Sequence, residues 1–160
     1  MASSQQRRRW THVQPSIRWQ NVPIPEPHVT ALVLSVFLHA FRPIRLVRQP
    51  YRVRQFGWVL IALSVSGVVA AVRAAGTETI ENPKSLRTAF PYSHSRNPMY
   101  VAWTGLYVGS GLLWNNVWPF VFLPAVAGWT HLVVRREEAT LARTFDAEYH
   151  EYRATVRRYL

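Results

Sequence analysis

One stretch constrains the fold of this chain more than any other feature: no Asp, Glu, Lys or Arg occurs from Val101 to Val134. A helix at the surface of a soluble protein needs a polar face along its length, and this stretch offers none. Asn115 and Asn116 interrupt the stretch near its middle. It therefore predicts two apolar helices joined by a link so short that they form a tight antiparallel hairpin.

Similar apolar runs occur four times along the chain, at Val29–Phe41, Phe56–Val72, Tyr100–Trp114 and Val117–Val134. As helices rising about 1.5 Å per residue they would extend roughly 20 to 27 Å each, a little short of the ~30 Å hydrocarbon core of a bilayer. Flanking Trp and Arg side chains and local bilayer thinning can make up the difference. The fold class predicted is an all-α, multi-pass transmembrane bundle of about four helices. The alternative is a soluble helical bundle.

The third apolar run contains Ala102, Gly105 and Gly109, which follow the small-xxx-small spacing. In membrane helices this spacing lets a neighbouring helix approach closely, although glycine is also common there without such a role.

Charge is concentrated between the apolar runs and at the ends of the chain. The net charge is +11, from 19 Lys and Arg against 8 Asp and Glu. A basic balance suits nucleic acid or an anionic lipid surface, and the location of these charges favours lipid. Residues 1–27 are polar, basic and contain several prolines, which indicates a mobile or surface-lying arm before a membrane domain over 28–160. We expect no cleavable signal peptide, because no apolar segment directly follows the basic N-terminus.

Membrane topology is left open by the arginines. Four crossings with a cytoplasmic C-terminus would place a group of arginines outside, against the positive-inside rule. They are Arg42, Arg45, Arg48, Arg52 and Arg54. A first apolar run that lies in the interface would remove this conflict.

The pattern changes after Val134. Apolar and aromatic residues then recur at steps of four, four, three, four and three, which is one face of an amphipathic helix or of two short helices. They are Leu141, Phe145, Tyr149, Tyr152, Val156 and Tyr159. We expect Arg143, Glu151, Arg153, Arg157 and Arg158 on the other faces. Such a tail would pack against the membrane surface or cap the bundle.

Two polar clusters flank the predicted hairpin, residues 91–100 before it and 135–138 after it. Because a hairpin returns the chain to the side from which it came, both clusters should meet at one membrane face. Asn97 and Pro98 in the first cluster are typical of a helix N-cap and first helical position. Such a helix end attracts anions, including carboxylates.

The second cluster has two interpretations. Glu137 and Glu138, at the end of an apolar helix, would bind ribose hydroxyls or an ammonium group. Alternatively they form a solvated pair held by Arg135 and Arg136.

Other polar residues carry weaker signals. His94 is either a general base or a surface residue, whereas His39 and His131 lie within apolar runs, as functional groups or as buried, hydrogen-bonded histidines. No metal is expected, because no His or carboxylate spacing suggests a metal site. No glycine-rich nucleotide motif follows a strand.

A series of short motifs also runs in order through the second half of the chain. It consists of Ala75-Gly76-Thr77, Pro91-Tyr92, Ser95-Arg96-Asn97-Pro98-Met99-Tyr100, Arg136-Glu137-Glu138 with Leu141, Phe145 through Tyr149 and Tyr152, and Val156-Arg157-Arg158. This set resembles the isoprenylcysteine carboxyl methyltransferase family, which is related to the membrane phospholipid methyltransferases. The resemblance covers about residues 72–160, and Phe90 stands where that family usually has glycine.

The resemblance implies an all-helical membrane enzyme that uses S-adenosylmethionine (SAM), has no Rossmann domain, and binds SAM at the cytoplasmic face. The loop near Lys84 and Ser85 would contribute backbone contacts. The cofactor-binding residues implied are Leu86, Arg87, Tyr92, Arg96, Asn97, Pro98, Met99, Tyr100, Glu137 and Glu138. A lipophilic acceptor would enter sideways from the bilayer.

Two kinds of acceptor are compatible with this reaction. A carboxylate, as on a prenylated cysteine, would depend on an arginine, for which Arg136 is the candidate. An amine lipid such as phosphatidylethanolamine must lose a proton, so His94 or Glu138 would act as a base. Two other functions are a non-catalytic membrane protein that binds anionic lipid through its arginines and a soluble nucleic-acid binder. The methyltransferase hypothesis requires no nucleic-acid partner.

Overall fold

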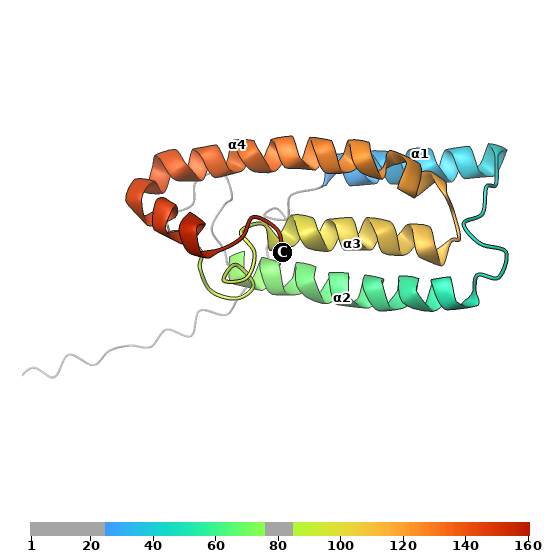
Figure 1. Ribbon diagram of the computed structural model, residues 1–160, viewed down its shortest axis with the longest axis horizontal. Coiled ribbons are helices and arrows are strands. Elements are labelled where there is room, and N and C mark those ends of the chain that lie inside the picture. Colours follow the sequence, from blue (N-terminus) through green and yellow to red (C-terminus); the bar gives the residue numbers. More distant parts are fainter. Residues whose placement is uncertain (1–24, 76–84) are drawn as a thin grey trace, which may run out of the picture.

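The computed structural model describes residues 25–75 and 85–160. Regular structure in these ranges is helical, with α1 at Glu26–Phe41, α2 at Tyr51–Ala75, α3 at Pro98–Leu113 and α4 at Trp118–Thr155 (Figure 1). The all-α class predicted from the sequence is confirmed for this part of the chain. Nearly all of the predicted N-terminal arm, together with Lys84, lies outside the described residues.

Helix α4 differs most from its predicted bounds. The apolar run ends at Val134, but the helix continues to a kink at Asp146, where φ is 38° and ψ is −109°. The residues that follow Val134 are mostly good helix formers such as Arg, Glu, Ala and Leu. The end of the apolar run thus marks a change of surface and not the end of the helix. Beyond the kink the chain folds back toward the start of α3 (Figure 1).

The four helices pack mainly in two pairs, α2 with α3 and α1 with α4 (Figure 1). Small residues permit the close contact of the first pair. A methyl group added to Gly57 of α2 would lie 2.8 Å from the Leu113 backbone nitrogen, and one added to Gly109 of α3 would lie 2.8 Å from Ile61 Cγ1. One on Gly105 would overlap Ser64 Oγ. The small-residue spacing in α3 therefore serves helix packing, and α2 is the partner.

The predicted hairpin between α3 and α4 is present, and its two asparagines hold it together. Asn115 has φ 52°, a left-handed conformation that asparagine tolerates better than most residues. Its side chain accepts a hydrogen bond from the Val47 nitrogen at 3.1 Å and donates one to the Val47 carbonyl at 2.9 Å. Asn116 donates to the Ser35 carbonyl at 3.2 Å. These bonds tie the hairpin to α1 and to the segment that links α1 with α2.

The tail caps one end of the bundle. All six residues of its predicted apolar face are buried or half-buried, with Tyr149 and Tyr152 buried most deeply. The Tyr152 hydroxyl donates to the Tyr92 carbonyl at 2.7 Å, which ties the tail to the loop before α3. Arg158 departs from the prediction: it lies half-buried against Glu138, because an ion pair there compensates its partial burial.

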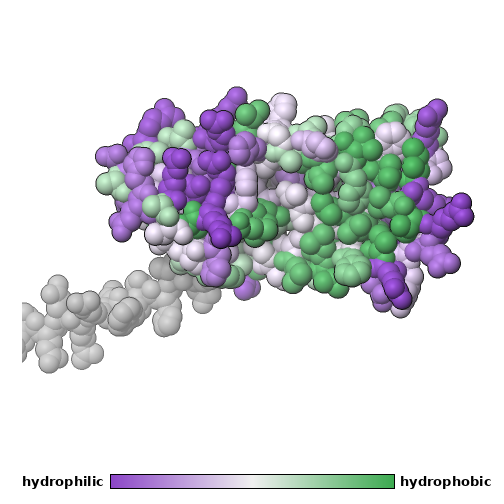
Figure 2. Space-filling view, viewed as in Figure 1, coloured by the Kyte–Doolittle hydropathy of each residue, from purple (hydrophilic) through white to green (hydrophobic). Residues whose placement is uncertain are grey.

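The outer surface carries many large apolar side chains. Phe56, Trp58 and Leu63 of α2 are each more than 60% exposed, and Phe37 of α1 and Trp129 of α4 are similarly exposed. Figure 2 shows a hydrophobic zone between polar ends on this face of the molecule. Among the described residues, one helix, α2, is both long and apolar enough to cross a membrane, and α1 is a shorter apolar helix.

Candidate active site

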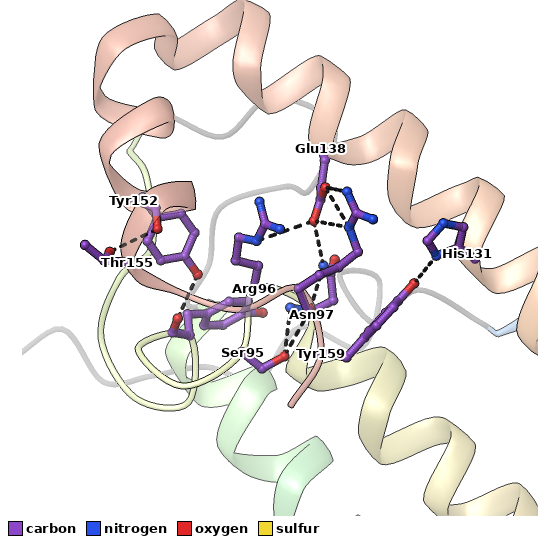
Figure 3. Close-up of polar contacts among 10 residues, drawn as sticks. Ser95, Arg96, Asn97, His131, Glu138, Tyr152, Thr155 and Tyr159 are labelled. Atoms are coloured by element: carbon purple, nitrogen blue, oxygen red, sulfur yellow. Dashed lines mark hydrogen bonds and ion pairs between the residues drawn. The ribbon is translucent and has the colours of Figure 1, made fainter.

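The two polar clusters meet where α3 begins and α4 leaves the apolar zone. The Tyr100 hydroxyl donates to Glu137 Oε1 at 2.7 Å, and Asn97 Nδ2 donates to Glu138 Oε1 at 3.1 Å. The hairpin therefore brings together residues that are about 40 positions apart in sequence, as the sequence predicts. Figure 3 shows this meeting point around Asn97 and Glu138.

Glu138 is the centre of a buried network. It is 7% exposed, and its carboxylate accepts hydrogen bonds from Arg158 Nε at 3.0 and 3.2 Å, with Arg158 Nη2 at 2.9 Å. Arg96 Nε lies 3.6 Å away on the other side (Figure 3). The carboxylate raises the pKa of Arg158 through this hydrogen bonding. Because Arg158, Asn97 and Arg96 surround it, the Glu138 carboxylate ties the tail of the chain to the start of α3.

The last residues of the tail, 157–160, form a segment across the start of α3 that we call the strap. Arg96 donates its backbone N–H to the Arg157 carbonyl at 2.9 Å. The Ser95 hydroxyl and Asn97 Nδ2 donate to the Arg158 carbonyl at 3.3 and 3.1 Å. Asn97 occupies the N-cap position of α3, as predicted, but its side chain makes no capping bond. It is engaged by Glu138 and the strap instead.

A cavity of about 130 Å³, called the polar cavity because Arg87, Arg96, Asn97 and Glu137 are among its lining residues, lies between the loop before α3, the first turn of α3 and α4. Nine of the ten cofactor-binding residues proposed from the sequence line it: Leu86, Arg87, Tyr92, Arg96, Asn97, Pro98, Met99, Tyr100 and Glu137. The tenth, Glu138, is absent from this lining. Ser85 of the loop predicted to contribute backbone contacts also lines the cavity.

Glu137 is the carboxylate of the polar cavity. It is half-buried, and burial raises the pKa of its carboxyl, while the hydrogen bond from Tyr100 partly opposes that rise. On the facing loop, burial raises the pKa of the Tyr92 phenol. The Nε and Nη1 atoms of Arg96 are buried and have no hydrogen-bond partner within the described residues. The cavity thus offers the Glu137 carboxylate, the Tyr92 phenol ring and the Arg96 guanidinium, whose Nε faces Glu138 while Nη1 has no hydrogen-bond partner among the described residues.

A larger apolar groove of about 720 Å³ adjoins the polar cavity. Residues of α2, α3, α4 and the strap line it, among them Leu63, Gly67, Gly105 and Ala127. Pro98 and Tyr100 line both spaces, so they form a wall that the groove and the cavity share. Two chemically different compartments therefore meet at the first turn of α3.

The two residues proposed from the sequence as catalytic lie outside both compartments. Arg136 is exposed on α4 and lines neither space. His94 is also exposed, and its imidazole contacts the Ser93 hydroxyl at 2.9 Å and the Phe90 ring. The hairpin brings the polar clusters together but leaves these two side chains facing outward.

Sequence reasoning did not assign several residues that the structure brings to the site. Leu141 and Tyr152 line the polar cavity, although the motif series had included both without a role. Arg158 binds Glu138, and His131 and Tyr159 lie in the groove. The regular spacing of apolar and aromatic residues in the tail was the sequence signal for some of these residues. It indicates which face of the tail is buried but not which residues that face contacts.

Comparison with known proteins identifies the family of the chain. A model of the phospholipid methyltransferase family matches residues 53–148, from the start of α2 through the kink in α4. No curated protein and no solved structure matches the chain significantly. The matched region exceeds half of the chain and contains both polar clusters and the hairpin between them. The chain therefore belongs to the phospholipid methyltransferase family.

Proposed function

We propose that this protein is an integral membrane methyltransferase that uses SAM to methylate the amine headgroup of a lipid. The observation that supports this most is the shared wall at Pro98 and Tyr100. A polar cofactor and an apolar acceptor need separate compartments that adjoin, so that the reactive group of each molecule meets the other. Methyl transfer then depends mainly on the alignment of these two groups.

The residues of the polar cavity fit SAM chemically. SAM supplies an electrophilic methyl group when bound, and it also carries a carboxylate, an ammonium, a ribose and an adenine. The Nη1 group of Arg96, which has no hydrogen-bond partner among the described residues, and the first turn of α3 suit the carboxylate. Glu137 suits the ammonium or the ribose hydroxyls. The Tyr92 ring suits either adenine stacking or a cation–π contact with the positive centre.

The apolar groove fits the chains of a lipid. Its lining is largely hydrophobic. The groove opens at the surface beside Leu63, whose side chain is 66% exposed in the apolar zone. A lipid lying in the bilayer would place its chains along α2 and α3 and its headgroup toward Tyr100. Lipid chains around the open side of the groove would keep water from the acceptor, so that nucleophilic attack would not compete with hydrolysis.

The composition of the groove favours an amine acceptor over a carboxylate. No Arg, Lys, Asp or Glu is among the described residues that line it. A carboxylate acceptor would need a cation there, and Arg136, the arginine considered for that role, is exposed elsewhere. An amine lipid enters as an ammonium, but it needs no fixed countercharge once a base has taken its proton and left the neutral, nucleophilic form.

The proposed membrane arrangement has four helices crossing, with the polar cavity at the cytoplasmic face and residues 28–160 forming the membrane domain. The apolar outer surface of α1, α2 and α4 supports this arrangement. So does the absence of charged residues from the hairpin helices up to Val134.

A methyl-transfer assay on purified protein in liposomes tests the proposal. Labelled methyl groups should pass from SAM to an ethanolamine lipid, and transfer to a prenylated cysteine should be at least ten-fold slower. Glu137→Gln should abolish most transfer, whereas Glu148→Gln, on an exposed part of the same helix, should not. Equal transfer to both acceptors would contradict the amine assignment. Folded protein that neither binds S-adenosylhomocysteine nor transfers methyl groups would contradict the enzyme assignment.

Filling the groove separates acceptor binding from cofactor binding. Ala127 lines the groove only, so Ala127→Phe should raise the KM for the lipid several-fold. Stabilisation by S-adenosylhomocysteine should be unchanged, because the polar cavity is left intact. An unchanged lipid KM would show that the acceptor binds elsewhere.

A further inference from the structure

A hydrogen-bonded pair of titratable side chains, His131 and Tyr159, lies within the largely apolar groove. His131 Nδ1 and the Tyr159 hydroxyl are 2.9 Å apart, and their rings are tilted with centroids separated by 6.1 Å. Both residues line the groove, and Figure 3 shows His131 on α4 meeting Tyr159 on the strap. An ionisable side chain within an apolar helix is costly in a membrane and usually has a functional partner.

No Asp, Glu, Lys or Arg is among the described residues that line the groove with His131, although Arg158 and Glu138 act electrostatically on its partner Tyr159. The titratable residues that line the groove are Tyr100 of α3, His131 of α4 and Tyr159 of the strap. Helix α2 contributes the hydroxyl of Ser64 but no titratable group to this lining. Within the described residues, Nδ1 is the only atom of the His131 ring that is hydrogen-bonded, so Nε2 remains free for a ligand.

The place of this pair along the groove matches a chemical need of the proposed acceptor. Tyr100 belongs to the wall shared with the polar cavity, so a headgroup that reaches that wall lies in the same compartment as His131. A protonated amine has no lone pair with which to attack a methyl group. A base that can take its proton inside a dry groove is therefore required before transfer.

We infer that His131 accepts the proton that the lipid ammonium must lose and that Tyr159 orients its imidazole, an inference that rests on the proposed function. For this step Nδ1 carries the imidazole hydrogen and donates it to the Tyr159 oxygen, so that Nε2 has a lone pair. An N–H bond of the ammonium breaks and its proton passes to Nε2, leaving a neutral amine. The amine lone pair then forms the N–CH₃ bond as the S–CH₃ bond of the sulfonium breaks, and that electron pair stays on sulfur. Positive charge moves from sulfur to nitrogen, and His131 releases its proton to solvent after product leaves.

The activity test depends on pH. His131→Gln should lower kcat about 100-fold at pH 7, within the range known for general bases. The deficit should shrink as the pH approaches about 10, where a primary ammonium loses its proton unaided. His39→Gln is the matched control, since His39 lies in the apolar helix α1 and lines neither compartment; it should retain wild-type rates. Tyr159→Phe should cause a smaller loss than His131→Gln.

A binding test needs no turnover. In detergent, wild-type protein should bind an ethanolamine lipid several-fold more tightly than a choline lipid, because a quaternary ammonium has no N–H to donate to Nε2. His131→Leu should remove that preference while leaving the affinity for the choline lipid within two-fold.

The outcomes separate this inference from the proposed function. Active wild type with a pH-independent loss in His131→Gln, equal to that in Tyr159→Phe, would mean that the pair only anchors the strap, and would overturn the inference. So would an unchanged headgroup preference in His131→Leu. Wild type that fails to bind S-adenosylhomocysteine or transfer methyl groups would instead overturn the proposed function itself.

Discussion

Adjacent glutamates in α4 have different environments and different expected roles. Glu138 is buried among Arg158, Arg96 and Asn97, whereas Glu137 faces the polar cavity and accepts from Tyr100. One residue along a helix is a rotation of about 100°, so neighbours contact different groups. The sequence predicted that this pair matters, but only the orientation of α4 separates the two carboxylates.

Removing the Glu138 carboxylate should destabilise the fold more than it affects chemistry directly. Glu138→Ala leaves Arg158 and Arg96 without their anionic partner, and breaking such a buried pair costs about 3 kcal/mol or more. Chemical unfolding in detergent would measure the loss. The double variant Glu138→Ala, Arg158→Met should recover part of it, because fewer unpaired charges remain. Full stability in the single variant would refute the network's structural role.

Glu137→Gln should lose ligand binding without losing stability. The carboxamide still accepts from Tyr100 but carries no charge, so affinity for S-adenosylhomocysteine should fall roughly 10- to 100-fold, as expected for a charged hydrogen bond. Calorimetric titration at pH 7 would measure the change. Tyr100→Phe, which keeps the carboxylate, should bind more tightly than Glu137→Gln; the reverse order would argue against a charge contact.

Glu137→Gln should also change how the stability of the ligand-free protein depends on pH. Burial raises the pKa of Glu137 above its ordinary value of 4.5, so the folded state favours the protonated form. The wild type therefore loses stability as the pH rises from about that value through the raised pKa. Glu137→Gln has no such loss, so its melting temperature relative to wild type should increase across this window. Parallel curves between pH 4 and 8 would count against a buried carboxyl.

At the scale of the elements, the close contact between α2 and α3 depends on glycines at the interface, where a larger residue would collide with the facing helix. Gly57→Ala would place a methyl group against the backbone of Leu113 and Gly109, neither of which can rotate away. We expect a loss of about 1 to 3 kcal/mol, typical of overpacking. Gly128→Ala in α4 is the control, since nothing lies within 4 Å of its added methyl group. That variant should gain up to about 1 kcal/mol from helix propensity.

Unfolding of both variants in detergent distinguishes these effects. A Gly57→Ala protein as stable as Gly128→Ala would mean that α2 and α3 are further apart than described. The sequence spacing predicted a close helix contact for α3 but did not identify α2 as the partner, because small residues mark a surface and not its neighbour.

For the whole molecule, the proposed four crossings would place the two polar ends on opposite sides of the membrane. The chain has no cysteine, so single cysteines can be introduced on a blank background. Arg48→Cys, in the link between α1 and α2, and Arg143→Cys, in the exposed part of α4, should react with an impermeant maleimide from opposite sides of sealed vesicles. Labelling of both from one side would contradict four crossings.

The sequence by itself determined the helical class and the hairpin, and its motifs indicated, through a family resemblance, nine of the residues that line the polar cavity. These follow from local features: hydropathy, a turn made by Asn115 and Asn116, and short motifs next to them. The tertiary structure decided which groups touch. It turned Arg136 and His94 outward, used Glu138 and Arg158 to close the site, and brought His131 to Tyr159. Such choices depend on the kink at Asp146 and on helix rotation, which arise from long-range packing and leave no local pattern.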